Sequence, residues 1–236
     1  KRLRQLVVAV VRRQVETRVP EVNFNGPEGR LEGRYHHGTD PASGIALVLH
    51  PHPQHGGSMN NKVVYTMFHA FVRMGFSVLR FNFRGVGRSQ GEYDQGQGEL
   101  SDAASALDWL HSYNPNAQAV WIGGFSFGAW IAMQLLMRRP EIDGFITVAP
   151  PASMYDFSFL APCPVSGQVV YGAKDNIIEE EAVHKLIEKL SSQRGVEIDF
   201  HTVEGADHFF NNHLETISGH LTEYVTARVA EKVAQG

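Results

Sequence analysis

One short turn decides the fold that this sequence predicts: Gly123-Gly124-Phe125-Ser126-Phe127-Gly128. An apolar, β-prone run over residues 118–122 precedes it, and a helix-forming run over residues 129–137 follows it. A strand that enters a helix through Gly-x-Ser-x-Gly is the context that a nucleophile elbow requires, whereas the bare pattern also fits a glycine-rich turn. Small residues are needed beside the serine because so sharp a reversal brings two backbones together. We therefore predict that Ser126 is a nucleophile, held in a strained conformation at the positive end of the helix.

Strands and helices alternate along the rest of the chain. The sequence predicts, in order, a β-hairpin (19–25 and 30–37), a strand (44–49), a helix (60–74), a strand (76–81), a helix from Ser101 and Asp102, the elbow strand and helix, strands (145–148 and 165–171), a helix (178–192), a strand (196–203) and a closing helix (213–234). This order predicts an α/β fold with a mostly parallel central sheet, an opening antiparallel hairpin and helices on both faces. In such sheets, sites form beyond the carboxyl ends of the strands.

Composition limits the classes of function. The chain has 236 residues, 43% of them hydrophobic and 19% charged, which fits one domain over residues 19–236. The net charge of −4 offers no global basic field for nucleic acid. Residues 1–18 carry most of their charge as Lys and Arg around a six-residue apolar run, so we predict a basic extension. That run is too short to span a membrane.

Cysteine usage bears on the compartment. Cys163 is the single cysteine, so an internal disulfide is excluded and nothing indicates an oxidising environment. We expect a cytoplasmic protein. The sequence leaves open whether the protein forms a homo-oligomer.

The strand-end rule selects partners for the serine. A serine hydroxyl needs a base, and the base needs an orienting acid. His208 follows the last predicted strand, and Asp175 follows the strand before it. Asp207 is adjacent to His208, where alignment with the imidazole is difficult, and Asp156 in an irregular stretch is the alternative acid. Asp175 also fits a loop or helix-capping residue.

The order serine, aspartate, histidine is that of the α/β-hydrolases, and four segments together resemble that superfamily. They are His50-Pro51-His52-Pro53 with Gly56-Gly57, the loop Arg84-Gly85-Val86-Gly87-Arg88-Ser89, the Gly124–Gly128 elbow, and Tyr171-Gly172-x-x-Asp175 paired with Gly205-x-x-His208. The first segment is similar to a small bacterial branch of lidless serine hydrolases, loosely grouped with dienelactone hydrolases. Dienelactone hydrolase has a cysteine where this chain has Ser126, so its lactone specificity is not implied. Only residues 149–164 occupy the place of a lid, too few for a cap domain.

The same resemblance implies an oxyanion hole made of two backbone N–H groups. One belongs to Phe127, and the other to the loop after residues 44–49, where His52 occupies the donor position and Gln54 is the alternative. Pro51 and Pro53 have no N–H.

Two other features offer candidate binding groups. The three histidines of the loop, His50, His52 and His55, lack acidic or cysteine companions, so we expect no metal. For Arg84 and Arg88 we favour structural salt bridges over contacts to an anionic substrate.

These residues predict a serine hydrolase that cleaves small-molecule carboxylic esters with small or short acyl groups, through an acyl-enzyme and without a cofactor. Thioesterase, acyltransferase and peptidase activities use the same groups and stay open. A non-catalytic binding protein on a hydrolase scaffold is the alternative from another class.

Overall fold

The structure is a computed structural model that describes residues 19–39, 44–160 and 162–235. The predicted basic extension, residues 1–18, lies outside the described residues. The strands are β1 (Glu21–Gly26), β2 (Gly29–His36), β3 (Ile45–Leu49), β4 (Ser77–Phe81), β5 (Val120–Phe125), β6 (Gly144–Val148), β7 (Gly167–Gly172) and β8 (Ile198–Val203). The helices are the 3₁₀ turn η1 (Pro53–His55), α2 (Lys62–Arg73), α3 (Gln97–Tyr113), α4 (Phe127–Leu136), α5 (Glu180–Ser191) and α6 (Leu214–Gln235).

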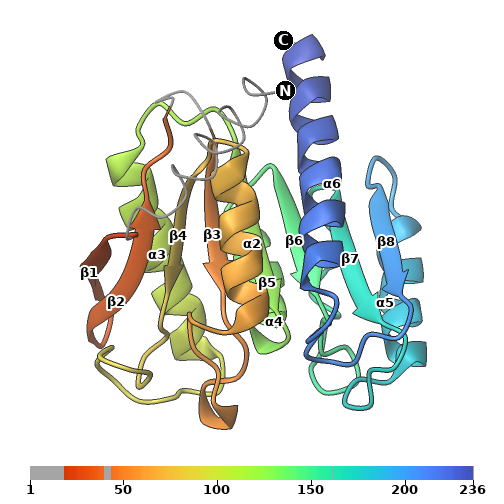
Figure 1. The fold of residues 1–236 in the computed structure, drawn as a ribbon, viewed down its shortest axis with the longest axis horizontal. Helices are drawn as coiled ribbons and strands as arrows, with labels where there is room; N and C mark the ends of the chain where they lie inside the picture. Colours follow the sequence, from red (N-terminus) through yellow and green to blue (C-terminus); the bar gives the residue numbers. More distant parts are fainter. Residues whose placement is uncertain (1–18, 40–43, 161, 236) are drawn as a thin grey trace, which may run out of the picture.

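The described strands form one sheet in the order β1-β2-β4-β3-β5-β6-β7-β8. The hairpin β1–β2 is antiparallel and joins β4 in antiparallel register. The remaining neighbours, from β4 through β3 to β8, are parallel. The predicted fold class is therefore confirmed. Because the parallel strands share one direction, their carboxyl ends meet at one edge, the lower edge in Figure 1.

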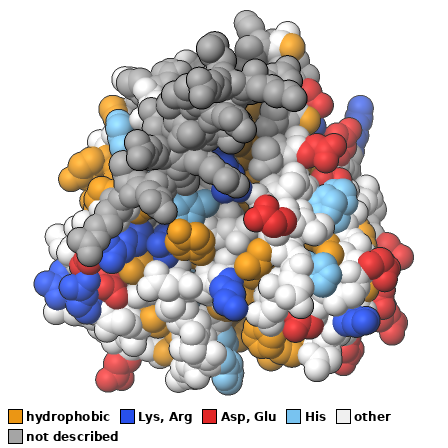
Figure 2. Space-filling model, viewed as in Figure 1, with side chains coloured by type: hydrophobic (Ala, Val, Ile, Leu, Met, Phe, Trp, Pro, Cys, Tyr) orange, Lys and Arg blue, Asp and Glu red, His pale blue; other side chains and the backbone are white. Residues whose placement is uncertain are grey.

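Helices cover both faces of the sheet, as the apolar runs predicted. Strand β3 is buried throughout: Ile45, Leu47 and Leu49 pack into the core under α3 and α4, whereas Ala46 and Val48 pack under α2 and α6. In Figure 1, α2 and α6 lie in front of the sheet and α3, α4 and α5 behind it. Figure 2 shows the front face, where charged side chains of both signs are mixed with apolar ones over its described part.

Helix α3 begins at Gln97, one turn before the predicted start at Ser101 and Asp102. Glu99 explains the difference, because its carboxylate accepts the N–H groups of Gly96 (2.7 Å) and Asp94 (2.9 Å) and so caps the helix. Asp102 is fully buried inside the helix rather than at its end.

Candidate active site

Ser126 lies at the junction between β5 and α4, at the carboxyl edge of the sheet. Its backbone has φ 53° and ψ −121°, a conformation that non-glycine residues rarely adopt. The Ser126 N–H donates to the Val148 carbonyl (2.9 Å), and its own carbonyl accepts the N–H of Ala129 (2.8 Å). The neighbouring strand and the first turn of the helix therefore hold the strained residue in place.

Glycines are required on both sides of Ser126 because backbones cross there. A Cβ on Gly124 would lie 2.3 Å from the Gly128 carbonyl oxygen. A Cβ on Gly128 would lie 2.4 Å from the Leu49 oxygen and 2.6 Å from the His50 oxygen, at the end of β3. These are backbone atoms, which cannot turn aside as a side chain can.

We expect Gly128→Ala to destabilise the protein by about 1–3 kcal/mol, because the start of α4 must move away from β3. Gly219→Ala is the matched control, since it lies within α6 and a Cβ there meets nothing within 4 Å. The control should be neutral or up to about 1 kcal/mol more stable, from helix propensity alone. Urea unfolding measures both; equal stabilities for the two variants would contradict the crowded elbow.

The structure brings Ser126, His208 and Asp175 together from three loops. His208 Nε2 lies 3.2 Å from Ser126 Oγ, and His208 Nδ1 lies 2.7 Å from Asp175 Oδ2. Asp175 follows β7 and His208 follows β8, so the parallel strands deliver both groups to the edge where β5 ends. With Nδ1–H donating to the carboxylate, Nε2 is left to accept the serine proton.

The surroundings of Asp175 favour its charged form. Its side chain has no exposed surface, and burial alone would raise its pKa. Hydrogen bonds from His208 and from the N–H groups of Ile178 and Ile177 (both 2.9 Å to Oδ1) outweigh burial, so the pKa of Asp175 lies below its usual value. The carboxylate is thus an acceptor at neutral pH.

The two other candidate acids, Asp156 and Asp207, make different contacts. Asp156 binds the N–H and hydroxyl of Ser158 (2.7 and 2.6 Å). Asp207 Oδ1 accepts the N–H of Phe209 (3.1 Å). His208 itself is only 4% exposed and lies against the Phe125 ring, with ring centroids 5.3 Å apart.

The loop after β3 faces the start of α4. Phe127 is the first residue of α4, so its N–H has no partner within the helix. The His52 carbonyl accepts the N–H groups of Gly57 (3.0 Å) and His55 (3.1 Å), whereas the His52 N–H donates to no other described backbone group. The Gln54 N–H already donates to His52 Nδ1 (3.2 Å), which disfavours this alternative oxyanion donor.

The histidines of this loop make hydrogen bonds within the protein. Burial lowers the pKa of His50 to about 4. As a neutral ring it donates from Nδ1 to the Pro51 carbonyl (2.6 Å) and accepts the Phe83 N–H at Nε2 (3.0 Å), which ties the ends of β3 and β4 together. In residues 19–39, 44–160 and 162–235, no group of three or more His, Cys, Asp or Glu side chains is arranged to hold a metal ion.

Arg84 and Arg88 form salt bridges, as we predicted from the sequence. The Arg84 guanidinium binds both oxygens of the buried Asp102 (2.8 and 3.0 Å). Arg88 binds Glu32 (2.9 Å) and Glu21 on the opening hairpin. The sequence did not predict that Arg84 pairs with Asp102, because Asp102 was assigned to the start of a helix.

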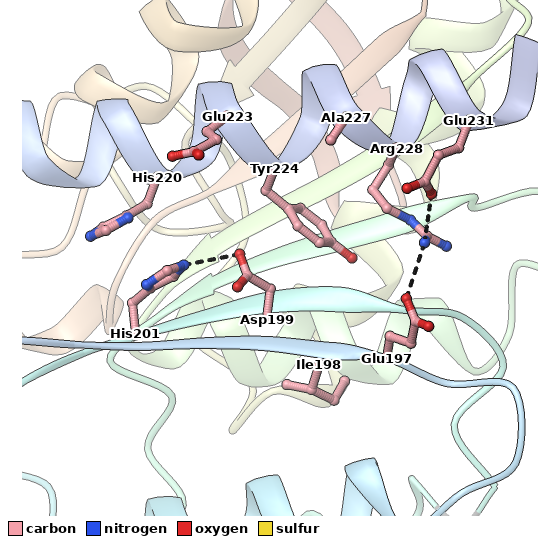
Figure 3. A pocket seen from close by; sticks show the side chains of 10 residues that line it. All are labelled: Glu197, Ile198, Asp199, His201, His220, Glu223, Tyr224, Ala227, Arg228 and Glu231. Carbon is pink, nitrogen blue, oxygen red and sulfur yellow. Dashed lines mark hydrogen bonds and ion pairs between the residues drawn. The ribbon is translucent and has the colours of Figure 1, made fainter.

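A hollow of about 440 Å³ lies between β8 and α6, and Figure 3 shows its lining. Several of its polar side chains pair with one another: His201 with Asp199 (3.0 Å), and Arg228 with Glu197 (3.4 Å) and Glu231 (2.9 Å). The lining includes none of Ser126, Asp175 and His208.

The fold, together with the residues at the carboxyl edge of the sheet, defines an α/β serine hydrolase without a lid. Residues 27–200 match the X-Pro dipeptidyl-peptidase (S15) family, and the chain belongs to this family. No helix in the described part of the chain combines the length and apolar character needed to cross a membrane.

Three individual proteins are similar to this chain over most of its length. The Rickettsia prowazekii protein RP471 is 54% identical over 211 residues, which cover 88% of this chain and 89% of that protein. The crystal structure of ATU1826, an α/β hydrolase from Agrobacterium tumefaciens, is 55% identical and superposes with a TM-score of 0.87, covering 90% of this chain and 97% of that one. XC6422 from Xanthomonas campestris, an α/β serine hydrolase without a lid, is 32% identical with a TM-score of 0.79, covering 89% and 95%.

Proposed function

We propose that this protein hydrolyses carboxylic esters of small or short-chain acyl groups through an acyl-enzyme. Ser126 Oγ attacks the ester carbonyl while His208 Nε2 takes its proton, and the imidazolium then gives that proton to the departing alcohol. Asp175 holds the imidazole in the required tautomer. A water molecule, activated by the same imidazole, then releases the acid and restores Ser126.

The N–H groups of Phe127 and His52 are the proposed oxyanion donors. Phe127 is at the positive end of α4, where backbone N–H groups favour a developing negative charge. His52 supplies the N–H that has no acceptor among the described backbone groups. No step of this reaction needs a cofactor.

One observation carries the proposal: the line of hydrogen-bonding contacts from Asp175 through His208 to Ser126, with distances of 2.7 and 3.2 Å. Its three members come from segments far apart in the chain, so local sequence alone does not account for their meeting. The strained backbone of Ser126 adds support, because such strain is costly and clusters at functional sites.

The preference for small acyl groups rests on the segment between β6 and β7. The described residues of 149–164 contain no helix or strand, and Phe157 and Leu160 are buried in the core under α4 and α5. These side chains therefore pack against the body of the protein rather than forming a long acyl channel.

A peptidase is the second candidate, favoured by the description of the matched family. An amide leaving group uses the same serine and imidazole but depends more on proton delivery to the departing nitrogen. The residues around Ser126 are common to both reactions, so substrates must decide between them.

We test the proposal with p-nitrophenyl acetate, butyrate, octanoate and palmitate, a butyryl thioester, and Gly-Pro-p-nitroanilide. We expect kcat/KM to be highest on acetate or butyrate and to fall by roughly tenfold or more at octanoate. If the anilide is the best substrate, the protein is a peptidase; if the thioester is, it is a thioesterase.

We also propose that residues 19–236 form one catalytic domain in the cytoplasm. The described chain runs from β1 at one edge of the sheet to β8 at the other, and both cores share that sheet. Cys163 is free and buried, and burial raises the pKa of its thiol, which suits a structural residue.

A further inference from the structure

Among the described residues, every polar group of His52 except its backbone N–H has a hydrogen-bond partner. The carbonyl accepts two backbone hydrogen bonds, from Gly57 and His55. The ring is bound at both nitrogens: Nδ1 by the Gln54 N–H (3.2 Å) and Nε2 by the Tyr93 hydroxyl (3.1 Å). A loop residue fixed in this way has little freedom to rotate its remaining N–H.

These contacts decide the tautomer of His52. Since the Gln54 N–H donates to Nδ1, the ring proton of the neutral imidazole lies on Nε2. Nε2–H then donates to Tyr93 Oη. Burial, followed by the nearby His55, lowers the pKa of His52, so the neutral ring is favoured.

Tyr93 is itself held in place. It directly precedes Asp94, whose N–H donates to the Glu99 carboxylate, as the N–H of Gly96 also does. Burial, followed by Tyr155 and Glu99, raises the pKa of Tyr93 to about 12, so its hydroxyl stays neutral, and its oxygen accepts the hydrogen bond from His52 Nε2–H.

The rings of His52 and Tyr93 also pack against Phe127, whose N–H is the other proposed oxyanion donor. The Phe127 ring lies 5.0 Å from the His52 ring and 6.1 Å from the Tyr93 ring, measured between centroids. Tyr93 and His52 therefore connect the loop after β3 to the first residue of α4.

We propose that Tyr93 is a positioning residue: it accepts the His52 Nε2–H hydrogen bond and so holds the His52 backbone N–H in place as an oxyanion donor. This inference rests on the proposed function. Tyr93 touches no reacting atom, so it acts on the transition state through His52 alone. A misplaced donor weakens binding of the oxyanion but not of the substrate ground state, so kcat should change and KM should not.

The first test is Tyr93→Phe, which keeps the ring and removes the hydroxyl. On p-nitrophenyl acetate we expect kcat to fall about 10- to 100-fold, while KM stays within about twofold of the wild-type value. This fall in kcat is smaller than the one expected when an oxyanion donor is lost completely. Tyr35→Phe is the matched control, because Tyr35 Oη also binds a histidine, His37 (2.7 Å), and packs on the far end of α3 against Tyr113. The control should keep the wild-type kcat.

The second test is a double-mutant cycle with His52→Asn, whose side-chain oxygen can still accept the Gln54 N–H but cannot reach Tyr93. We expect His52→Asn to lower kcat at least as much as Tyr93→Phe does, because it also removes the ring that packs on Phe127. The double variant should be no slower than His52→Asn alone, since the hydrogen bond to Tyr93 is already lost there. Multiplying losses would overturn the inference, as would a wild-type kcat in Tyr93→Phe.

Failure of the proposed function gives a different result. If wild-type protein hydrolyses esters and Tyr93→Phe matches it, only the positioning role is rejected. If the wild-type protein hydrolyses none of the esters, the proposed function is rejected, and the positioning role with it.

Discussion

Ser126→Ala is expected to lower kcat on p-nitrophenyl butyrate by about 10⁶-fold, because no acyl-enzyme can form without the hydroxyl. The alanine keeps the backbone, so the elbow, the helix and the N–H groups at its start stay in place. Steady-state and single-turnover kinetics on purified protein, with wild type assayed at matched concentration, measure the effect.

Ser158→Ala is the control for that substitution. Ser158 bears a hydroxyl in the segment between β6 and β7 but binds Asp156 rather than His208. It should keep the wild-type kcat. If Ser126→Ala retains most of the wild-type rate, another nucleophile or a different site does the hydrolysis, and the assignment of Ser126 is wrong.

Asp175→Asn has the second largest expected effect, a fall in kcat of about 10⁴-fold. An asparagine amide can turn its NH₂ toward His208 Nδ1, which moves the ring proton to Nε2 and leaves no acceptor for the serine proton. The fold should survive, because the side-chain oxygen can still accept the N–H groups of Ile177 and Ile178. Circular dichroism and thermal unfolding report on folding beside the kinetics.

Asp156→Asn and Asp207→Asn are the matched controls, since each removes one carboxylate charge whose hydrogen bonds go to Ser158 or Phe209 and not to the His208 ring. Both should stay close to the wild-type rate. A severe loss in Asp156→Asn together with an unaffected Asp175→Asn would reverse our choice of acid.

A small number of physical rules made it possible to predict the strands from the sequence. The same rules predicted that Ser126, Asp175 and His208 meet at one edge of the sheet. Continuous apolar runs such as 44–49 must be covered on both faces, and parallel strands deliver their following loops to one edge. Gly124 and Gly128 signal the elbow because no larger residue fits where backbones cross.

What the sequence did not predict are the contacts between connecting loops. Tyr93 lies in a glycine-rich connection, and no periodicity links it to His52, 41 positions away. The start of α3 was wrong for a related reason: Glu99 caps the helix by folding back on Gly96, while Asp102, a residue that favours helix starts, is instead buried against Arg84. Such pairings depend on tertiary packing rather than on local propensity.

The most direct test of the central claim is to treat the folded protein with a fluorophosphonate and locate the adduct by peptide mass spectrometry. We predict one adduct, on Ser126, that forms in step with the loss of esterase activity and is absent from Ser126→Ala. Two results would contradict the account. One is an intact, folded protein that takes up no label, which is the behaviour of a binding protein on a hydrolase scaffold. The other is an adduct on a residue other than Ser126.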